Sequence, residues 1–359
     1  MNPRYQTLAG AMLLALSGAS SALTFNFTYV AGTSPQAMQG FIDAGALWSA
    51  LFSDSVVLDM TVGTSTLGAG ILASTGARSA SFGYSPFYSA LSTDRSSAND
   101  FIAVASLGTG PSFGLLINRT SDNPNGSGSA TPYLDTTGAN NTTINLTTAN
   151  AKALGLAVGT GTVGACATTC DASIQFGNTI AFDFNPNDGI TAGQFDFVGI
   201  AAHEIGHALG FVSGVDVLDT NSPPVNGPFL ANQFTFVNSL DLFRYSALSL
   251  ASGVIDFTAD TRTKYFSING GVTVGPSFST GRNFGDGQQA SHWKDSLGIG
   301  IMDPTAAPGE LLTITANDQL AFDVIGWNLS AVPEPATYAL FALGLAGIAA
   351  RRRQVRQSD

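Results

Sequence analysis

Apolar positions recur along the chain with two periods, and each period predicts one type of element. Alternation at every second residue predicts strands at 23–30 and 56–62, because neighbouring side chains of a strand point to opposite faces. Recurrence every three or four residues predicts amphipathic helices at 34–53 and within 84–107. Beyond residue 22, the chain therefore begins with strands and helices in alternation.

The middle of the chain is polar and irregular before it becomes apolar again. Residues 118–150 are rich in Asn, Thr, Ser and Gly, and they predict a long surface loop with a short strand near its end. Two short runs, 173–176 and 179–184, flank a Gly-Asn pair and predict a β-hairpin with a two-residue turn. Residues 183–189 have the Asn and Asp content of a calcium loop but not its glycine position, which favours an ordinary turn.

A further helix is predicted from the apolar run that begins at Phe195 and ends before Gly210, where a left-handed turn suits a glycine. This run contains the pattern H-E-x-x-H, formed by His203, Glu204 and His207. Residues four apart share a helix face, so the two imidazoles can face one metal ion and Glu204 can reach a water molecule on it. Zinc hydrolases have this arrangement. The alternative is a helix with two partly buried, hydrogen-bonded histidines.

The third metal ligand has two candidates. The chain contains three histidines, and the third, His292, lies ten residues before Met302. Asp216 is nearer in sequence, six residues past Gly210. His292 is favoured because imidazole matches the other two ligands, and because the cost of closing a loop grows only with the logarithm of its length.

The predicted folded region ends with a helix. Thr315-x-x-Asp318 is a capping signature that opens a helical pattern ending at Gly326-Trp327. Between the H-E-x-x-H helix and His292 lies a long insert, in which Asp241 and Arg244 are predicted to form a structural ion pair. We therefore predict one folded domain over residues 23–330.

Composition indicates a globular protein and argues against nucleic acid as a partner. The 359 residues are 44% hydrophobic and 11% charged, which suits a sizeable core rather than disorder. The net charge is -11, and no basic patch occurs before the last residues. The two cysteines, Cys166 and Cys170, are predicted to close a small disulfide loop in an exported protein. The alternative is a thiolate that occupies the zinc site in a latent form.

Both ends of the chain have the layout of export signals. Residues 1–22 predict a signal peptide, with Arg4 before an apolar core and a Ser-Ser-Ala cleavage site. Residues 331–353 contain a Pro-Glu-Pro box, an apolar run of 15 residues at 336–350 and three arginines, and 354–359 form a polar end. An apolar run of this length is shorter than the roughly 20 residues that span a bilayer upright.

The tail resembles the PEP-CTERM sorting signal of Gram-negative bacteria. The resemblance implies export to the cell surface or the extracellular space, transient membrane insertion of the tail, and processing by an exosortase-type enzyme. An ordinary C-terminal membrane anchor remains the alternative.

The segment from His203 to Phe211, with a Met302 turn downstream, resembles the metzincin clan of zinc metalloproteases. Most metzincins carry the third ligand three residues after the glycine, a position filled here by Ser213. The leishmanolysin-like branch instead has its third histidine far downstream and before the Met turn, and His292 is similar to that pattern. The resemblance implies an α+β fold: a twisted mixed sheet, the zinc-binding helix, and a smaller C-terminal subdomain.

The implied activity is that of a secreted or surface zinc-dependent endopeptidase that acts on protein or peptide substrates. One Zn²⁺ would be held by His203, His207 and His292, Glu204 would act as general base on water, and Met302 would be a packed floor. A catalytically inactive zinc-containing surface, biofilm-matrix or adhesin protein is the main alternative, and a metal-free matrix protein is another. The intact Glu204 favours the enzyme, because a binding module does not need that carboxylate.

Overall fold

The computed structural model describes residues 23–223, 225–227 and 229–330. The predicted signal peptide, the sorting tail and the polar end lie outside the described residues. The predicted domain of 23–330 is therefore the part described below.

A four-stranded sheet forms one side of the molecule. Its strand order is β1-β2-β8-β3, in which β1, β2 and β8 are parallel and β3 is an antiparallel edge strand. These strands are β1 (Thr24–Tyr29), β2 (Val57–Ser65), β8 (Ala172–Gly177) and β3 (Ala73–Ala77). The sheet is thus mixed, with one antiparallel edge strand.

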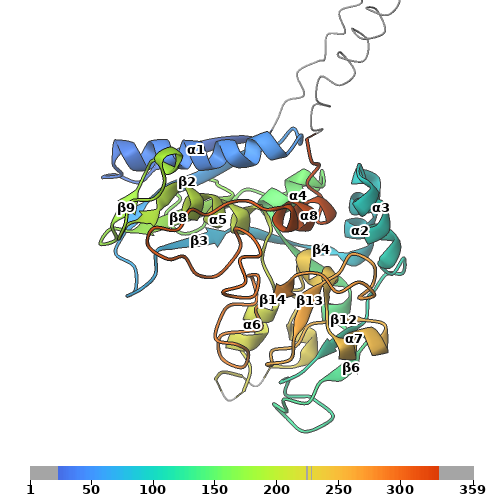
Figure 1. Ribbon diagram of the computed structural model, residues 1–359. Coiled ribbons are helices and arrows are strands. Elements are labelled where there is room, and N and C mark those ends of the chain that lie inside the picture. The colour runs from blue at the N-terminus through green and yellow to red at the C-terminus, as the bar shows by residue number, and fades with distance from the viewer. Residues whose placement is uncertain (1–22, 224, 228, 331–359) are drawn as a thin grey trace, which may run out of the picture.

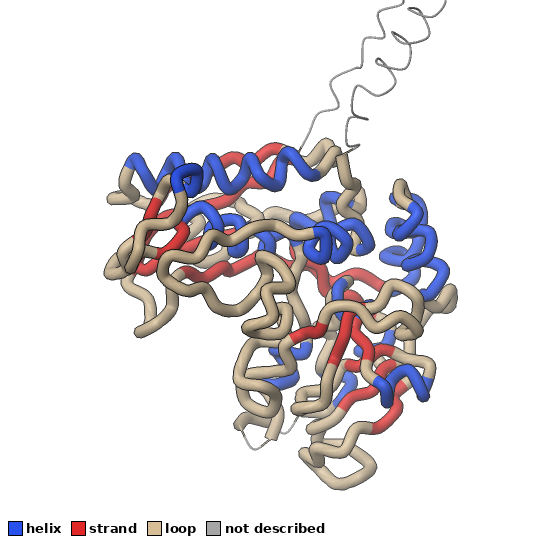
Figure 2. Tube along the Cα trace, in the orientation of Figure 1, coloured by secondary structure: helices blue, strands red, loops and turns tan. Residues whose placement is uncertain are grey.

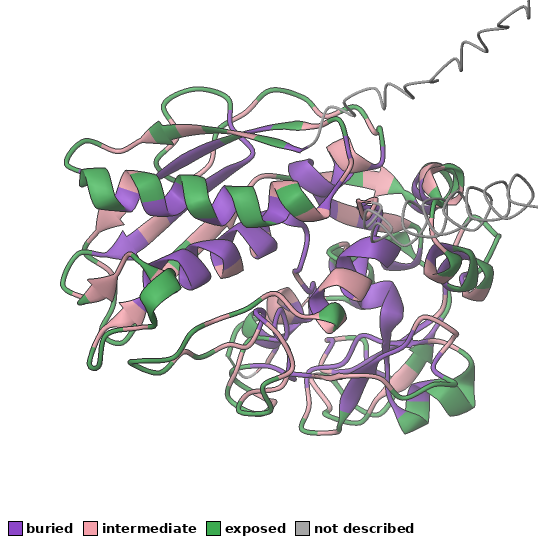
Figure 3. Ribbon diagram, turned by 45° about the horizontal axis from the view of Figure 1, so that its top comes forward, coloured by how far each residue is buried: buried purple, intermediate pink, exposed green. Residues whose placement is uncertain are grey.

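Two helices pack together beside this sheet (Figure 1). They are α1 (Pro35–Leu51) and α5 (Phe197–Leu209), the helix that carries H-E-x-x-H. Gly40 of α1 faces the ring of Phe197, and the indole Nε1 of Trp48 donates to the carbonyl of Ala202 at 2.9 Å. In Figure 3 the outer face of α1 is exposed, whereas α5 is largely buried. The histidine-bearing helix is therefore a core element.

The rest of the domain is built from small sheets and short helices. The sheets have the orders β12-β5-β6 and β11-β13-β14, with two-stranded pairs β4-β7 and β9-β10. Long stretches between residues 267 and 315 are loop (Figure 2). The strands are β4 (Ser79–Gly83), β5 (Leu115–Ile117), β6 (Tyr133–Asp135), β7 (Thr143–Thr147), β9 (Phe182–Asp183), β10 (Phe195–Asp196), β11 (Arg244–Tyr245), β12 (Ile255–Asp256), β13 (Lys264–Phe266) and β14 (Ser277–Phe278). The remaining α-helices are α2 (Tyr84–Asp94), α3 (Ala98–Ser106), α4 (Thr148–Ala153), α6 (Val215–Thr220), α7 (Ala247–Ser252) and α8 (Ala316–Val324).

Several predicted elements are confirmed. The first two strands and α1 lie within a few residues of their predicted bounds, and Gly210 ends α5 with φ of 121°. Thr315 and Asp318 form the predicted capping box of α8. Cys166 and Cys170 form a disulfide, so neither thiolate is free to occupy a metal site in this structure.

The helical pattern within 84–107 is also confirmed, as two helices, because Ser97 and Asp100 build a capping box that starts α3. Other predictions are wrong. The hairpin at Gly177 does not form: β9 pairs in parallel with β10, not with β8. The polar region 118–150 has the predicted short strand near its end, β7, but it also contains β6 and the start of α4, so it is not one long loop.

The predicted ion pair between Asp241 and Arg244 is also wrong. Asp241 accepts hydrogen bonds from Ser213, Gly214 and Asn238. The Arg244 guanidinium donates to backbone carbonyls instead. Asp241 and Arg244 thus form no direct ion pair, and the buried Nε of Arg244 has no hydrogen-bond partner among the described residues.

We predict that the contact between α1 and α5 does not tolerate a larger side chain at Gly40. A Cβ atom there would lie 2.4 Å from Cδ1 of Phe197. Gly40→Leu should therefore lower the free energy of unfolding by about 1–3 kcal/mol or more, the usual cost of overpacking a core. Chemical denaturation measures this, with Gln36→Leu on the exposed face of the same helix as the control. Equal effects of the two changes would contradict the prediction.

Candidate metal centre

Helix α5 is held at both ends, which fixes the histidines on it. Asp196 caps its first turn by accepting from the amide of Gly199 at 2.9 Å, and the amide of Leu312 donates to the same carboxylate at 3.1 Å. At the other end the positive φ of Gly210 lets the chain turn beside Asn150. The position of the helix, and of the histidines on it, is therefore fixed.

The three histidines of the chain meet at one point. The Nε2 atom of His207 lies 3.1 Å from Nε2 of His203 and 3.1 Å from Nε2 of His292. In the part of the chain that the structure describes, this is the one group of three or more His, Cys, Asp or Glu residues that could hold a metal ion. The third histidine favoured by the sequence analysis thus joins the other two.

Each imidazole is oriented through its other nitrogen. Nδ1 of His203 lies 2.7 Å from the carbonyl of Ile301, Nδ1 of His207 lies 2.8 Å from that of Phe211, and Nδ1 of His292 lies 3.3 Å from that of Gln289. A carbonyl can only accept, so each Nδ1 carries a proton, and the Nε2 of each ring in its neutral form presents a lone pair. Three lone pairs therefore converge.

Burial favours the neutral form of two of these rings. It lowers the pKa of His207 to about 3, and it lowers the pKa of His292 well below its ordinary value. Neutral imidazole is the form that ligates metals. A tetrahedral zinc ion with Zn–N bonds of 2.0–2.1 Å separates its ligand nitrogens by about 3.3 Å, close to the spacing of these atoms. The residues present fit such an ion.

Asp216, the alternative ligand, is not part of this group. It lies on α6, and its carboxylate accepts from the amides of Ala290 and Ser291 and from the Ser291 hydroxyl. The guanidinium of Arg244 donates to the carbonyl of Ala290. The loop just before His292 is therefore held between a carboxylate and a guanidinium, and Asp216 supports the third histidine without facing the other two.

Ser213, which fills the position of the third ligand in most metzincins, also holds this loop. Its amide donates to the Ser291 hydroxyl at 2.9 Å, and its own hydroxyl donates to Asp241 at 2.5 Å. The turn after the H-E-x-x-H helix is thus tied to the loop that delivers His292.

Met302 lies against α5 at Gly206. Met302 is fully buried, and a Cβ atom at Gly206 would lie 2.5 Å from its sulfur. Met302 therefore packs against the histidine-bearing helix, and a glycine in that helix makes room for it.

Asp318 joins the Met302 turn to the segment after His292. Its carboxylate accepts from Nε1 of Trp293 at 2.8 Å and from the amides of Ile301 and Met302 at 2.9 and 3.4 Å. The sequence analysis identifies Asp318 as part of a helix cap, and the structure shows this further role. A carboxylate that caps a helix can be predicted from nearby residues, but its contacts with residues far along the chain cannot.

Glu204 is 7% exposed and lies next to the edge strand β3. The Thr75 hydroxyl is 2.6 Å from Oε2 of Glu204 and 3.0 Å from its backbone carbonyl. Burial raises the pKa of the Glu204 carboxyl. Thr75 is missed in the sequence analysis because the strand Ala-Ser-Thr-Gly-Ala has small residues and no apolar alternation.

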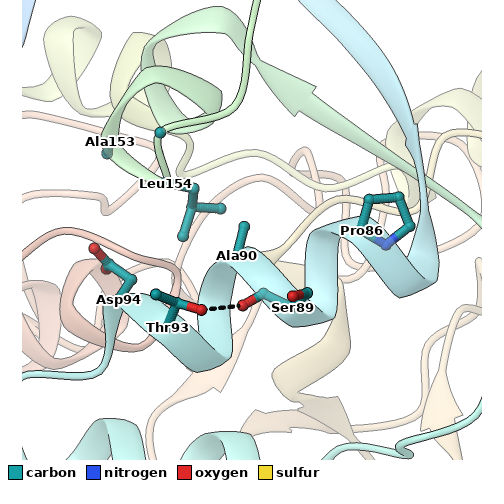
Figure 4. A pocket seen from close by; sticks show the side chains of 8 residues that line it. Pro86, Ser89, Ala90, Thr93, Asp94, Ala153 and Leu154 are labelled. Carbon is teal, nitrogen blue, oxygen red and sulfur yellow. Dashed lines mark hydrogen bonds between the residues drawn. The ribbon is translucent and has the colours of Figure 1, made fainter.

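A shallow groove elsewhere on the surface is separate from this centre. It lies between α2 and the end of α4, and Asp94 is the charged group that lines it (Figure 4). None of the three histidines lines it, so it is not part of the candidate metal centre.

Comparison with known proteins identifies the tail. Residues 331–353 match the model of the PEP-CTERM protein-sorting motif. The protein is therefore exported and directed to the cell surface, with an exosortase as the enzyme that recognises the signal. No curated protein and no solved structure matched the chain. Among the described residues, no helix is long and apolar enough to cross a membrane.

We predict that Asp318→Asn destabilises the domain, because an amide cannot replace a carboxylate that accepts from the Trp293 indole and several amides. Leaving buried donors without an acceptor should lower the free energy of unfolding by at least about 2 kcal/mol. Chemical denaturation measures the loss. The control is Asp188→Asn, an exposed aspartate at a turn, and a loss at Asp318 no larger than that of the control would contradict the prediction.

Proposed function

We propose that this exported protein is a zinc-dependent endopeptidase of metzincin-like type. The observation that carries the proposal is the convergence of three Nε2 lone pairs beside a buried glutamate. Three acceptors this close repel one another unless a cation lies between them, and His₃ is a ligand set of catalytic zinc. If His203 and His207 were only a hydrogen-bonded pair in the core, a third imidazole beside them would not be needed.

A zinc ion at this point would supply an acidified water molecule, with a pKa lowered toward about 7, for attack on a carbonyl carbon. His203, His207 and His292 would hold the ion, each oriented by its backbone carbonyl. Such oriented ligands keep their geometry through the reaction.

Glu204 would act as the general base. It follows His203 directly on α5, and it is not a member of the ligand group. Its carboxylate would take a proton from the attacking water and pass it to the amine of the cleaved peptide bond. Met302 would take no part in the chemistry and would support α5 by packing against Gly206.

The edge strand β3 favours a peptide substrate. It pairs with β8 on one side and ends the sheet on the other. An edge strand can pair with an extended peptide through its backbone, and β3 lies beside Glu204 through Thr75. A polypeptide laid along this edge would pass close to the three histidines.

We expect Glu204→Gln to keep the metal and lose the activity. The amide preserves the shape of the side chain but cannot accept the proton, so cleavage of casein should fall by at least about 100-fold. Metal analysis and casein cleavage by the purified domain, with and without chelator, test this. Full cleavage by the metal-loaded variant would remove Glu204 from the mechanism. A zinc-loaded wild type that cleaves nothing would favour an inactive surface or matrix protein.

We expect His292 and Asp216 to differ sharply in their effect on zinc binding. His292→Ala removes a ligand and should abolish stoichiometric binding. Asp216→Ala loosens the loop that carries His292 and should weaken binding by about 10–100-fold without abolishing it, as is usual for groups that orient a ligand. Titration with a competing chelator measures both affinities. Loss of binding in Asp216→Ala alone would make Asp216 the ligand.

A further inference from the structure

We propose that Thr75 is a positioning residue that orients the Glu204 carboxylate for proton transfer. This inference rests on the proposed function and names a residue outside the H-E-x-x-H motif. It is carried by one hydrogen bond between two elements that are far apart in the sequence.

The contact has the geometry of a charge-assisted hydrogen bond. The distance of 2.6 Å between Oγ1 of Thr75 and Oε2 of Glu204 lies in the usual range of about 2.5–2.7 Å for a hydroxyl on a carboxylate. The hydroxyl has one proton, and the ionised carboxylate is a stronger acceptor than the backbone carbonyl of Glu204 at 3.0 Å. Thr75 therefore donates mainly to the side chain.

This bond gives the two carboxylate oxygens of Glu204 different roles. Within the described residues, Thr75 is the hydrogen-bond donor to Oε2, and no donor contacts Oε1. A carboxylate held at one oxygen cannot turn freely about its last torsion angle. Oε1 is thus left as the oxygen that can take the proton.

The support behind Thr75 is rigid. Thr75 pairs with Ile174 of β8, which is fully buried, and β3 packs directly on α5. Its β-branched side chain has few rotamers, so the hydroxyl keeps one direction. Catalytic groups need a support of this kind, because small misplacements cost rate.

The test compares Thr75→Val with Thr75→Ser in the zinc-loaded protein. Valine keeps the shape and removes the donor, whereas serine keeps the donor. We expect Thr75→Val to lower kcat on fluorescent casein by about tenfold or more, with KM and zinc content within about twofold of the wild type. Thr75→Ser should restore kcat to within about threefold. Thr28→Val, at an exposed threonine of β1 in the same sheet, is the matched control and should change nothing.

A second measurement does not depend on activity. In the metal-free protein, Thr75→Val should lower Tm, because it leaves the Glu204 carboxylate without a donor. In a Glu204→Ala background the same change should leave Tm within about 1 °C, because there is no carboxylate to satisfy. Thr75→Ala should behave as Thr75→Val does, and it serves if the valine variant does not fold.

The outcomes separate this inference from the proposed function. A zinc-loaded wild type without hydrolysis overturns the proposed function, and the role of Thr75 in catalysis with it. Hydrolysis by the wild type that Thr75→Val leaves unchanged overturns the role of Thr75 alone. A kcat that falls equally in Thr75→Val and Thr75→Ser would also overturn it, because the hydroxyl would then not be the cause.

Discussion

Three imidazoles occupy one small volume in this protein, and the rest of the structure serves to keep them there. The Nε2 atom of His207 lies 3.1 Å from those of His203 and His292, and each Nδ1 lies beside a backbone carbonyl. Such a cluster of lone pairs is costly without a cation, because nothing else in it can donate. A divalent ion bound between the three Nε2 atoms would remove this cost, and no other group in the cluster would.

Buried carboxylates hold segments that are far apart in the sequence close to the three histidines. Asp216 holds the loop before His292, and Asp318 holds the segment after it together with the Met302 turn. Both accept mainly from backbone amides and from hydroxyl or indole groups rather than from cations, which fixes a loop without demanding an opposite charge. A histidine separated from the other two by more than 80 residues thus becomes as well placed as one on the same helix.

The local features of the fold could be predicted from the sequence, and the long-range ones could not. Helical period places His203 and His207 on one face, and a capping signature places the start of α8. The strand β3 is not predicted, because its small residues have no apolar alternation, and the role of Thr75 is therefore not predicted either. The hairpin at Gly177 was predicted from a turn signal, but tertiary pairing of β9 with β10 prevailed. The roles of Asp216 and Asp318 depend on contacts between segments that no local pattern encodes.

The sorting motif makes this an exported protein, and the imidazole cluster is the basis of the proposed hydrolysis of peptide bonds. The central claim is that the three rings hold one zinc ion. Anomalous X-ray diffraction at the zinc edge, from crystals of the exported protein grown without chelator, tests it most directly. We predict one peak at about 2.0–2.1 Å from the Nε2 atoms of His203, His207 and His292. A metal-free cluster in which the rings are hydrogen-bonded to one another, in protein purified with zinc present, would contradict the account.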